Sequence, residues 1–123
     1  MARNRDEARL QQVIVAWCRN RGLRPIHVAN EHVRNAREAA CAIREGMEPG
    51  VSDLLIFERC PGAPAARGIA LELKTPRGRV SQAQAAWQDR MRRQGWVCAV
   101  IRSKQEAVDL LTGLGFGRVG SKD

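Results

Sequence analysis

The stretch Gly68–Lys74, with the sequence GIALELK, decides the fold. Successive side chains of a β-strand point to opposite faces, so one face receives the apolar side chains of Ile69, Leu71 and Leu73. Glu72 and Lys74 share the opposite face, where a carboxylate and an ammonium group emerge side by side at the end of the strand. A Glu-x-Lys pair alone is common, and a surface salt bridge on an edge strand is its ordinary explanation. A further acidic residue nearby would distinguish an active site from such a salt bridge.

Asp53 is the candidate for that further acid. The run 51–57 is apolar apart from Asp53 and the adjacent Ser52, and it predicts a second, buried strand. A carboxylate is costly to bury unless it is paired or binds a metal. Residues 58–68 contain two prolines and two glycines and predict a hairpin loop between the two strands. In such a hairpin the start of one strand lies beside the end of the other, so we expect Asp53 near Glu72 and Lys74.

Two carboxylates on neighbouring strands suit Mg²⁺, which binds carboxylates, water and substrate phosphates. A metal held by Asp53 and Glu72 would polarise a scissile phosphate and lower the pKa of a bound water. Lys74 would orient or deprotonate that water, or balance charge in the transition state. These residue types therefore predict phosphodiester hydrolysis without a covalent nucleophile.

Helices and strands alternate along the rest of the chain. Hydrophobic periodicity predicts helices over 5–21, 32–45 and 82–94, and a last helix that begins after Ser103. Short β-branched segments predict strands at 24–29 and 96–101. The expected fold class is therefore α/β, with a mixed central sheet flanked by helices.

Chain length indicates the number of domains, and net charge indicates the kind of binding partner. The 123 residues favour one domain over 1–123, with 113–123 as a flexible tail. The net charge is +8, and most of the 21 basic residues are arginine, whose planar fork suits phosphate. This charge fits nucleic acid, an anionic membrane surface or an acidic partner. Tyrosine is absent and phenylalanine rare, so a platform for base stacking is not expected.

Neither a membrane span nor a secretion signal is expected. The sequence lacks a run of about 18 apolar residues, and its charged N-terminus lacks the apolar segment of a signal peptide. We therefore expect the protein in the cytoplasm, of a bacterial or phage-infected cell. The four cysteines form no CxxC pair and are expected as reduced thiols.

Asp53 followed by Glu-x-Lys resembles the signature of the PD-(D/E)xK nuclease superfamily. More closely, residues 5–112 resemble a stand-alone VRR-NUC domain, the virus-type replication and repair nuclease module. The matching segments are Asn30-Glu31 with Arg34, Pro49–Leu54, Glu72–Lys74, Gly78–Ser81 with Gln84 and Trp87, and Gly95–Val97. One departure is Ser52, where the family usually has a proline that shapes the turn and binds no metal.

The resemblance implies a restriction-endonuclease-like PD-(D/E)xK core and a nuclease that uses Mg²⁺ or Mn²⁺. Asp53, Glu72 and Lys74 take the catalytic positions, and the first two are also metal ligands. The backbone carbonyl of Leu73 often completes the coordination in such folds. Gln84 matches a motif glutamine on the helix after Glu-x-Lys, from which it would reach the site. No small-molecule cofactor is expected.

Two more carboxylates compete for a supporting role at the metal. Glu7 joins the inward stripe of the first predicted helix with Leu10 and Ile14, and members of the superfamily usually carry an inward acid there. The alternative for Glu7 is an acid in the first helical turn that favours the helix dipole. Glu31 matches the Asn-Glu pair of the family, with an N-cap or a partner of Arg34 as its alternatives.

Four basic residues flank the predicted site: Arg34, Arg37, Arg77 and Arg79. They would grip the phosphate backbone, which requires positive charge but no contact with bases. For each of them, a solvated surface position is the alternative.

Together these features predict a structure-selective DNA endonuclease that acts on four-way junctions or other branched DNA in replication, repair or recombination. The resemblance to dimeric junction resolvases implies a homodimer, whose two-fold axis would place two active sites on opposite strands. One alternative is a non-cleaving DNA-binding module on a nuclease-like fold. Another is a small interaction protein with an incidental Glu-x-Lys strand. The joint presence of Asp53, Glu72 and Lys74 argues against both.

Overall fold

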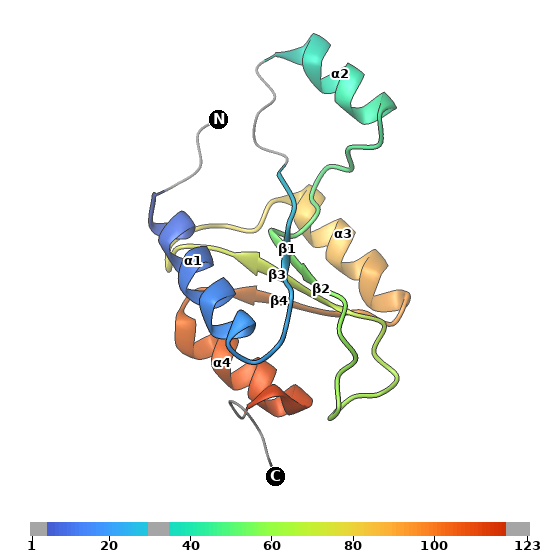
Figure 1. Ribbon diagram of the computed structural model, residues 1–123. Coiled ribbons are helices and arrows are strands. Elements are labelled where there is room, and N and C mark those ends of the chain that lie inside the picture. The colour runs from blue at the N-terminus through green and yellow to red at the C-terminus, as the bar shows by residue number, and fades with distance from the viewer. Residues whose placement is uncertain (1–4, 30–34, 118–123) are drawn as a thin grey trace.

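The structure is a computed structural model that describes residues 5–29 and 35–117. Its centre is a four-stranded sheet with the order β1-β2-β3-β4 (Figure 1). The strands are β1 (Ile26–His27), β2 (Leu54–Ile56), β3 (Ile69–Leu73) and β4 (Val97–Ile101). β2 is antiparallel to β1 and to β3, whereas β4 is parallel to β3. The sheet is therefore mixed, as predicted. β3 is a central strand, which excludes a salt bridge on an edge strand.

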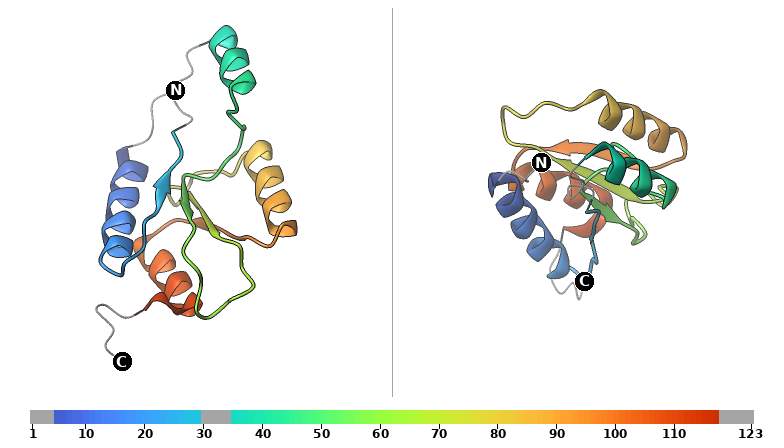
Figure 2. Two further views of the ribbon diagram at one scale, coloured as in Figure 1. Left: turned by 45° about the vertical axis from the view of Figure 1, so that its right-hand side comes forward. Right: turned by 90° about the horizontal axis from the view of Figure 1, so that it is seen from above.

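Helices cover both faces of the sheet. α1 (Arg5–Arg19) and α4 (Lys104–Leu111) pack against each other on one face, where α1 contacts β3 and α4 contacts β4. α3 (Gln82–Arg93) contacts β4 from the other face (Figure 2). This arrangement confirms the predicted α/β class. No helix within the described residues has both the length and the hydrophobicity needed to span a bilayer.

The main core lies between the sheet and the layer formed by α1 and α4. Its buried residues are Ile14, Cys18, Leu23, Leu54, Ile56, Cys60, Ile69, Leu71, Leu73, Ile101, Ala107 and Leu111. The apolar face of β3 predicted from side-chain alternation is therefore the face that packs on α1 and α4. All five residues of β3 are buried, so the opposite face of this strand is also shielded from water.

The register of the hairpin places Asp53 opposite Glu72. Leu54 pairs with Leu71 across β2 and β3, so the residue before Leu54 faces the residue after Leu71. Both leucines belong to the core under α1 and α4. Because side chains alternate, Asp53 and Glu72 turn toward the α3 side. The predicted hairpin thus brings the two carboxylates together.

Two strands are shorter than predicted. β2 covers Leu54–Ile56 rather than 51–57, and β1 covers Ile26–His27 rather than 24–29. Proline has no N–H to donate to a ladder, so Pro25 limits β1 at its start. Asp53 precedes β2 but still belongs to the sheet, because its backbone O accepts a hydrogen bond from Val28 N at 3.0 Å.

α2 (Ala36–Arg44) projects from the body of the domain (Figure 1). The side chain of Asn35 caps it by accepting a hydrogen bond from Glu38 N. The predicted helix began at residue 32, and residues 30–34 lie outside the described part of the chain.

The chain after Gly113 differs from the flexible tail that we expected. Residues Thr112–Phe116 (η1) continue from α4, and both Leu114 and Phe116 pack against the core. Leu114 O also accepts a hydrogen bond from Gly62 N at 2.9 Å. The burial of these two apolar side chains stabilises the segment, although its glycine-rich composition suggested a flexible tail. Residues 118–123 lie outside the described residues.

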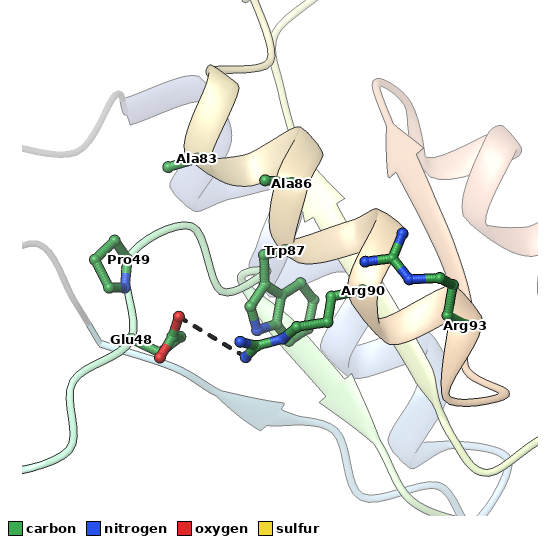
Figure 3. Close-up of a pocket in the computed structure, with 7 residues that line it drawn as sticks. All are labelled: Glu48, Pro49, Ala83, Ala86, Trp87, Arg90 and Arg93. Atoms are coloured by element: carbon green, nitrogen blue, oxygen red, sulfur yellow. Dashed lines mark ion pairs between the residues drawn. The ribbon is translucent and has the colours of Figure 1, made fainter.

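Two contacts tie the loop before β2 to α3. Glu48 Oε2 lies 3.8 Å from Arg90 Nη2 across a groove of about 410 Å³ (Figure 3). These side chains are 51% and 55% exposed, so the pair contributes less than about 1 kcal/mol. Gly50 makes the closer contact, since an added Cβ would collide with the backbone carbonyl of Ala83. Its φ of +85° also favours glycine. Gly50 therefore sets how closely the Asp53 loop approaches α3.

We expect Gly50→Ala to destabilise the fold more than Gly22→Ala. Gly22 has a similar φ of +80°, but nothing lies within 4 Å of an added Cβ. Backbone strain should cost roughly 1–2 kcal/mol at either position, and the collision at Gly50 should add about 1–3 kcal/mol. Urea unfolding of both variants measures the difference, and equal losses of stability would contradict the close contact.

Candidate active site

Asp53 is held by strands on both sides. Its Oδ2 accepts a hydrogen bond from Leu73 N at 2.7 Å, while its backbone O is bound by the edge strand at Val28. The N–H and C=O of one strand residue point to the same side of the strand. The carbonyl of Leu73 is therefore also directed toward the Asp53 side of β3. This end of the sheet presents a fixed carboxylate beside a backbone carbonyl.

Glu72 is buried, with 2% of its surface exposed. Its Oε2 accepts a hydrogen bond from Gln84 Nε2 at 3.0 Å and lies 3.9 Å from Lys74 Nζ. Its Oε1 is also buried and receives no hydrogen bond from a donor group in residues 5–29 or 35–117. The facing side chain is Asp53, which is also an acceptor when ionised. One oxygen of Glu72 is therefore satisfied and the other is not.

The start of α3 fixes the direction of the Gln84 amide. Ser81 Oγ accepts from Gln84 N at 3.1 Å, and Gln84 Oε1 accepts from Ser81 N at 2.8 Å, which together form a capping box. Because the amide oxygen is bound there, the amide Nε2 is left to donate to Glu72. A local signal for helix initiation thus orients a residue of the site.

Lys74 follows β3 directly and lies on the same side as Glu72. Its backbone N donates to Ile101 O at 3.0 Å, and its side chain is 14% exposed. Lys74 joins Asp53, Glu72 and Gln84 in one group, which we name the carboxylate cluster. These four residues come from three separate segments of the chain.

The sequence matches the family model of the VRR-NUC domain over residues 4–105. The chain belongs to the VRR-NUC domain family. This is a nuclease family. The carboxylate cluster of this VRR-NUC domain thus lies within the matched region.

Two solved structures share the fold. One, described as a VRR_NUC domain protein, has a TM-score of 0.72 and 19% identity, with 93% of this chain and 91% of that chain covered. The other, described as a VRR_NUC domain, has a TM-score of 0.60 and 18% identity, with 87% of this chain and 95% of that chain covered. At these identities the likeness concerns the fold alone. No curated protein matches the sequence.

The VRR-NUC domain strongly perturbs the acidity of Glu72. Its pKa is raised from 4.5 to about 9, first by burial and then by the negative charge of the facing Asp53. Lys74 opposes this rise and Glu7 adds to it. Without a bound cation, burial and the facing Asp53 therefore favour the protonated form of the Glu72 carboxyl group.

Of the two acids predicted to support the metal site, the structure describes Glu7 but not Glu31. Glu7 lies in α1, partly buried, and close enough for its charge to act on Glu72. This is the inward position expected of it, and its supporting role stays a prediction. Glu31 lies outside the described residues, as does Arg34.

The remaining arginines fall in two places. Arg77 and Arg79 are exposed and follow Lys74 closely in the chain. Arg37 is exposed on α2, which stands apart from the sheet (Figure 1). Arg77 and Arg79 thus follow a residue of the carboxylate cluster in the chain, whereas Arg37 lies on a helix away from the sheet. DNA binding by these arginines stays a prediction.

Asp53 and Glu72 are the residues with which the site could hold a divalent cation. Among the described residues, no group of three or more His, Cys, Asp or Glu side chains is arranged to hold a metal ion. Mg²⁺ often needs only one or two carboxylates, because water and substrate phosphate complete its coordination. The buried, unpartnered Oε1 of Glu72 beside Asp53 fits such a cation, which would relieve the repulsion between the two groups.

The sequence carries no signal of how Asp53 is positioned. Backbone N–H groups of Val28 and Leu73 hold it, and backbone groups leave no residue-type signal in a sequence. Ser52 was noted only as a departure from the family proline. It is fully buried, and its Oγ has no hydrogen-bond partner within the described part of the chain.

Without divalent metal, the protein should lose stability as the pH rises from about 4.5 toward about 9. The folded state binds the Glu72 proton more tightly than the unfolded state, so unfolding releases a proton in this range. The slope should reach about 1.4 kcal/mol per pH unit. Glu72→Gln removes this titration, so its gain in stability over the wild type should grow with pH in urea unfolding with EDTA.

The matched control is Glu45→Gln, which removes one carboxylate from the exposed end of α2. This control should keep the pH dependence of the wild type. If Glu72→Gln also kept it, Glu72 would not carry the buried proton.

Proposed function

We propose that this VRR-NUC domain is a divalent-metal-dependent DNA endonuclease that cuts branched DNA. The observation that carries the proposal is the pair formed by Asp53 and Glu72. A buried carboxyl with an unpartnered oxygen, facing a second carboxylate, is destabilising unless a proton or a cation lies between them. Such a pair has no evident benefit for folding, which supports a role in catalysis.

Asp53, Glu72 and the Leu73 carbonyl would hold Mg²⁺ or Mn²⁺. The bound cation would polarise the scissile phosphate and lower the pKa of an attacking water. Asp53 is suited to this role because the Leu73 amide holds its carboxylate in place. Gln84 serves as a positioning residue, since its amide fixes Oε2 of Glu72.

Lys74 would act on the reacting groups directly. Its Nζ lies 3.9 Å from Glu72 Oε2 and is only slightly exposed. From this position the ammonium group would orient the attacking water or balance the negative charge that develops on the phosphate. Removal of its charge should therefore affect the chemical step more than DNA binding.

DNA is the proposed substrate because the chain is strongly basic and arginine-rich. Arg77 and Arg79, exposed near Lys74, would bind backbone phosphates on either side of the scissile bond. We further propose a homodimer, which would place two carboxylate clusters on opposite strands of a four-way junction. Analytical ultracentrifugation of the protein bound to four-way DNA tests this proposal. If only one protomer were bound to each junction, the result would contradict the dimer.

We expect the wild type to cleave at least one of single-stranded, duplex, flap and four-way DNA with Mg²⁺ or Mn²⁺, with branched DNA preferred. Lys74→Ala should lower the cleavage rate by roughly 10²- to 10⁴-fold and leave DNA affinity nearly unchanged. Lys104→Ala is the matched control, because Lys104 is an exposed lysine at the start of α4.

Wild-type cleavage by Lys74→Ala would refute the assigned role of Lys74. Tight DNA binding without cleavage of any substrate would favour the alternative, a non-cleaving DNA-binding module on a nuclease-like fold.

Asp53→Asn should abolish Mn²⁺ binding measured by calorimetry in the absence of DNA. The asparagine oxygen still accepts a hydrogen bond from Leu73 N, so the fold should be preserved, while the anionic ligand is lost. Asp109→Asn, which changes an exposed residue of α4, should bind Mn²⁺ like the wild type. Retained binding in Asp53→Asn would exclude Asp53 as a ligand.

A further inference from the structure

Arg102 connects the end of β4 to the segment that follows Lys74. Its Nη1 donates to Thr75 O at 2.8 Å and to Gly78 O at 2.7 Å, and lies 3.5 Å from Pro76 O. The first two bonds use both hydrogens of this nitrogen at short distances, so the Pro76 contact adds little. Hydrogen bonds from a charged donor are stronger than those between neutral groups. One guanidinium group thus binds two carbonyls of one turn.

The turn that Arg102 holds packs against Lys74. Gly78 N donates to Thr75 O at 3.0 Å and closes a β-turn over residues 75–78. A Cβ added at Gly78 would lie 3.4 Å from both Cβ and Cδ of Lys74. The backbone of the turn therefore borders the aliphatic part of the lysine side chain. A shift of the turn would open space beside Lys74 and let its ammonium group move.

Arg102 is itself anchored from α4. Its backbone N donates to Glu106 Oε1 at 2.6 Å, and Glu106 N donates to the capping Ser103 Oγ at 3.2 Å. The preceding residue, Ile101, is buried and accepts a hydrogen bond from Lys74 N. Backbone and side chain of the same short segment thus support Lys74 from two directions.

From this geometry we propose that Arg102 is a positioning residue for Lys74. Its guanidinium group fixes the β-turn over residues 75–78. Because this β-turn packs against the Lys74 side chain, it restricts where the Lys74 ammonium group lies. The inference rests on the proposed nuclease function of the carboxylate cluster. The buried core residues Ile101, Ala107 and Leu111 also hold β4 and α4 in place, so we expect the fold to tolerate the loss of these bonds.

The test compares three full-length variants in single-substrate kinetics on the best-cleaved DNA with saturating Mg²⁺. Arg102→Met keeps the length of the side chain and removes its donors. Arg102→Lys keeps a positive nitrogen donor at shorter reach. Arg92→Met is the matched control, because Arg92 also donates to a backbone carbonyl, Cys98 O at 3.0 Å, but not to the turn.

We expect Arg102→Met to lower kcat by roughly 10- to 100-fold, since small misplacements of reacting groups have effects of this size. KM should change less than kcat. Arg102→Lys should recover part of the loss, and Arg92→Met should keep the kcat of the wild type. All rates are taken at a temperature where each variant is fully folded.

A second readout does not depend on cleavage. Hydrogen exchange of the Gly78 amide, followed by NMR, should become about tenfold to a hundredfold faster in Arg102→Met. Exchange at amides within β3 should stay as in the wild type, and Arg92→Met should leave Gly78 unchanged.

The outcomes separate this inference from the proposed function. An unchanged exchange rate of the Gly78 amide in Arg102→Met would show that Arg102 does not stabilise the turn, whether or not the protein cleaves DNA. Faster exchange with an unchanged kcat overturns the positioning of Lys74 while the nuclease function stands. A wild type that cleaves no DNA overturns the proposed function itself, with the exchange result still reporting on the turn.

Discussion

The buried carboxyl group of Glu72 is the constraint that the surrounding structure has to accommodate. Glu72 lies in the middle of the fold, on a strand that is covered on both faces, and directly opposite a second acid. Burial and the charge of Asp53 both disfavour its ionisation, and the nearby Lys74 offsets only part of this effect. A domain of this size has little stability to spare. A cost of this kind at the centre of the sheet is expected where function, rather than folding, selects the residue.

The rest of the domain holds that unfavourable pair in one geometry. The hairpin register aligns Asp53 with Glu72, and the edge strand fixes the backbone of Asp53. Across the sheet, the capping box directs the Gln84 amide to Glu72. Gly50 keeps the Asp53 loop in close contact with the same helical turn. The two acids thus remain together because backbone contacts hold Asp53 and a side-chain hydrogen bond from α3 holds Glu72.

The apolar pattern made the fold predictable. Alternation in β3 identified the face that packs on α1 and α4, and the hairpin loop predicted the proximity of Asp53 and Glu72. Gln84 entered only through family resemblance, because a glutamine three residues after Ser81 also has an ordinary explanation in helix capping. The contacts of Arg102 with backbone carbonyls gave no signal, since carbonyls are present at every residue. The packing of Leu114 and Phe116 was missed because glycines surround them.

The low sequence identity to solved structures of the same fold is consistent with a difference between core residues and site residues. About four-fifths of the residues differ from a structure with the same fold at a TM-score of 0.72. Many apolar sets can fill the layer between β3 and α1, provided that their volume and pattern are kept. The proposed catalytic role would leave the carboxylate cluster no such freedom, because carboxylate, amide and ammonium groups cannot replace one another. Arg102 belongs to neither the apolar core nor the carboxylate cluster, because its side chain binds backbone carbonyls. Such a side chain depends on the path of the backbone around Lys74 and not on which residues form the turn that it binds.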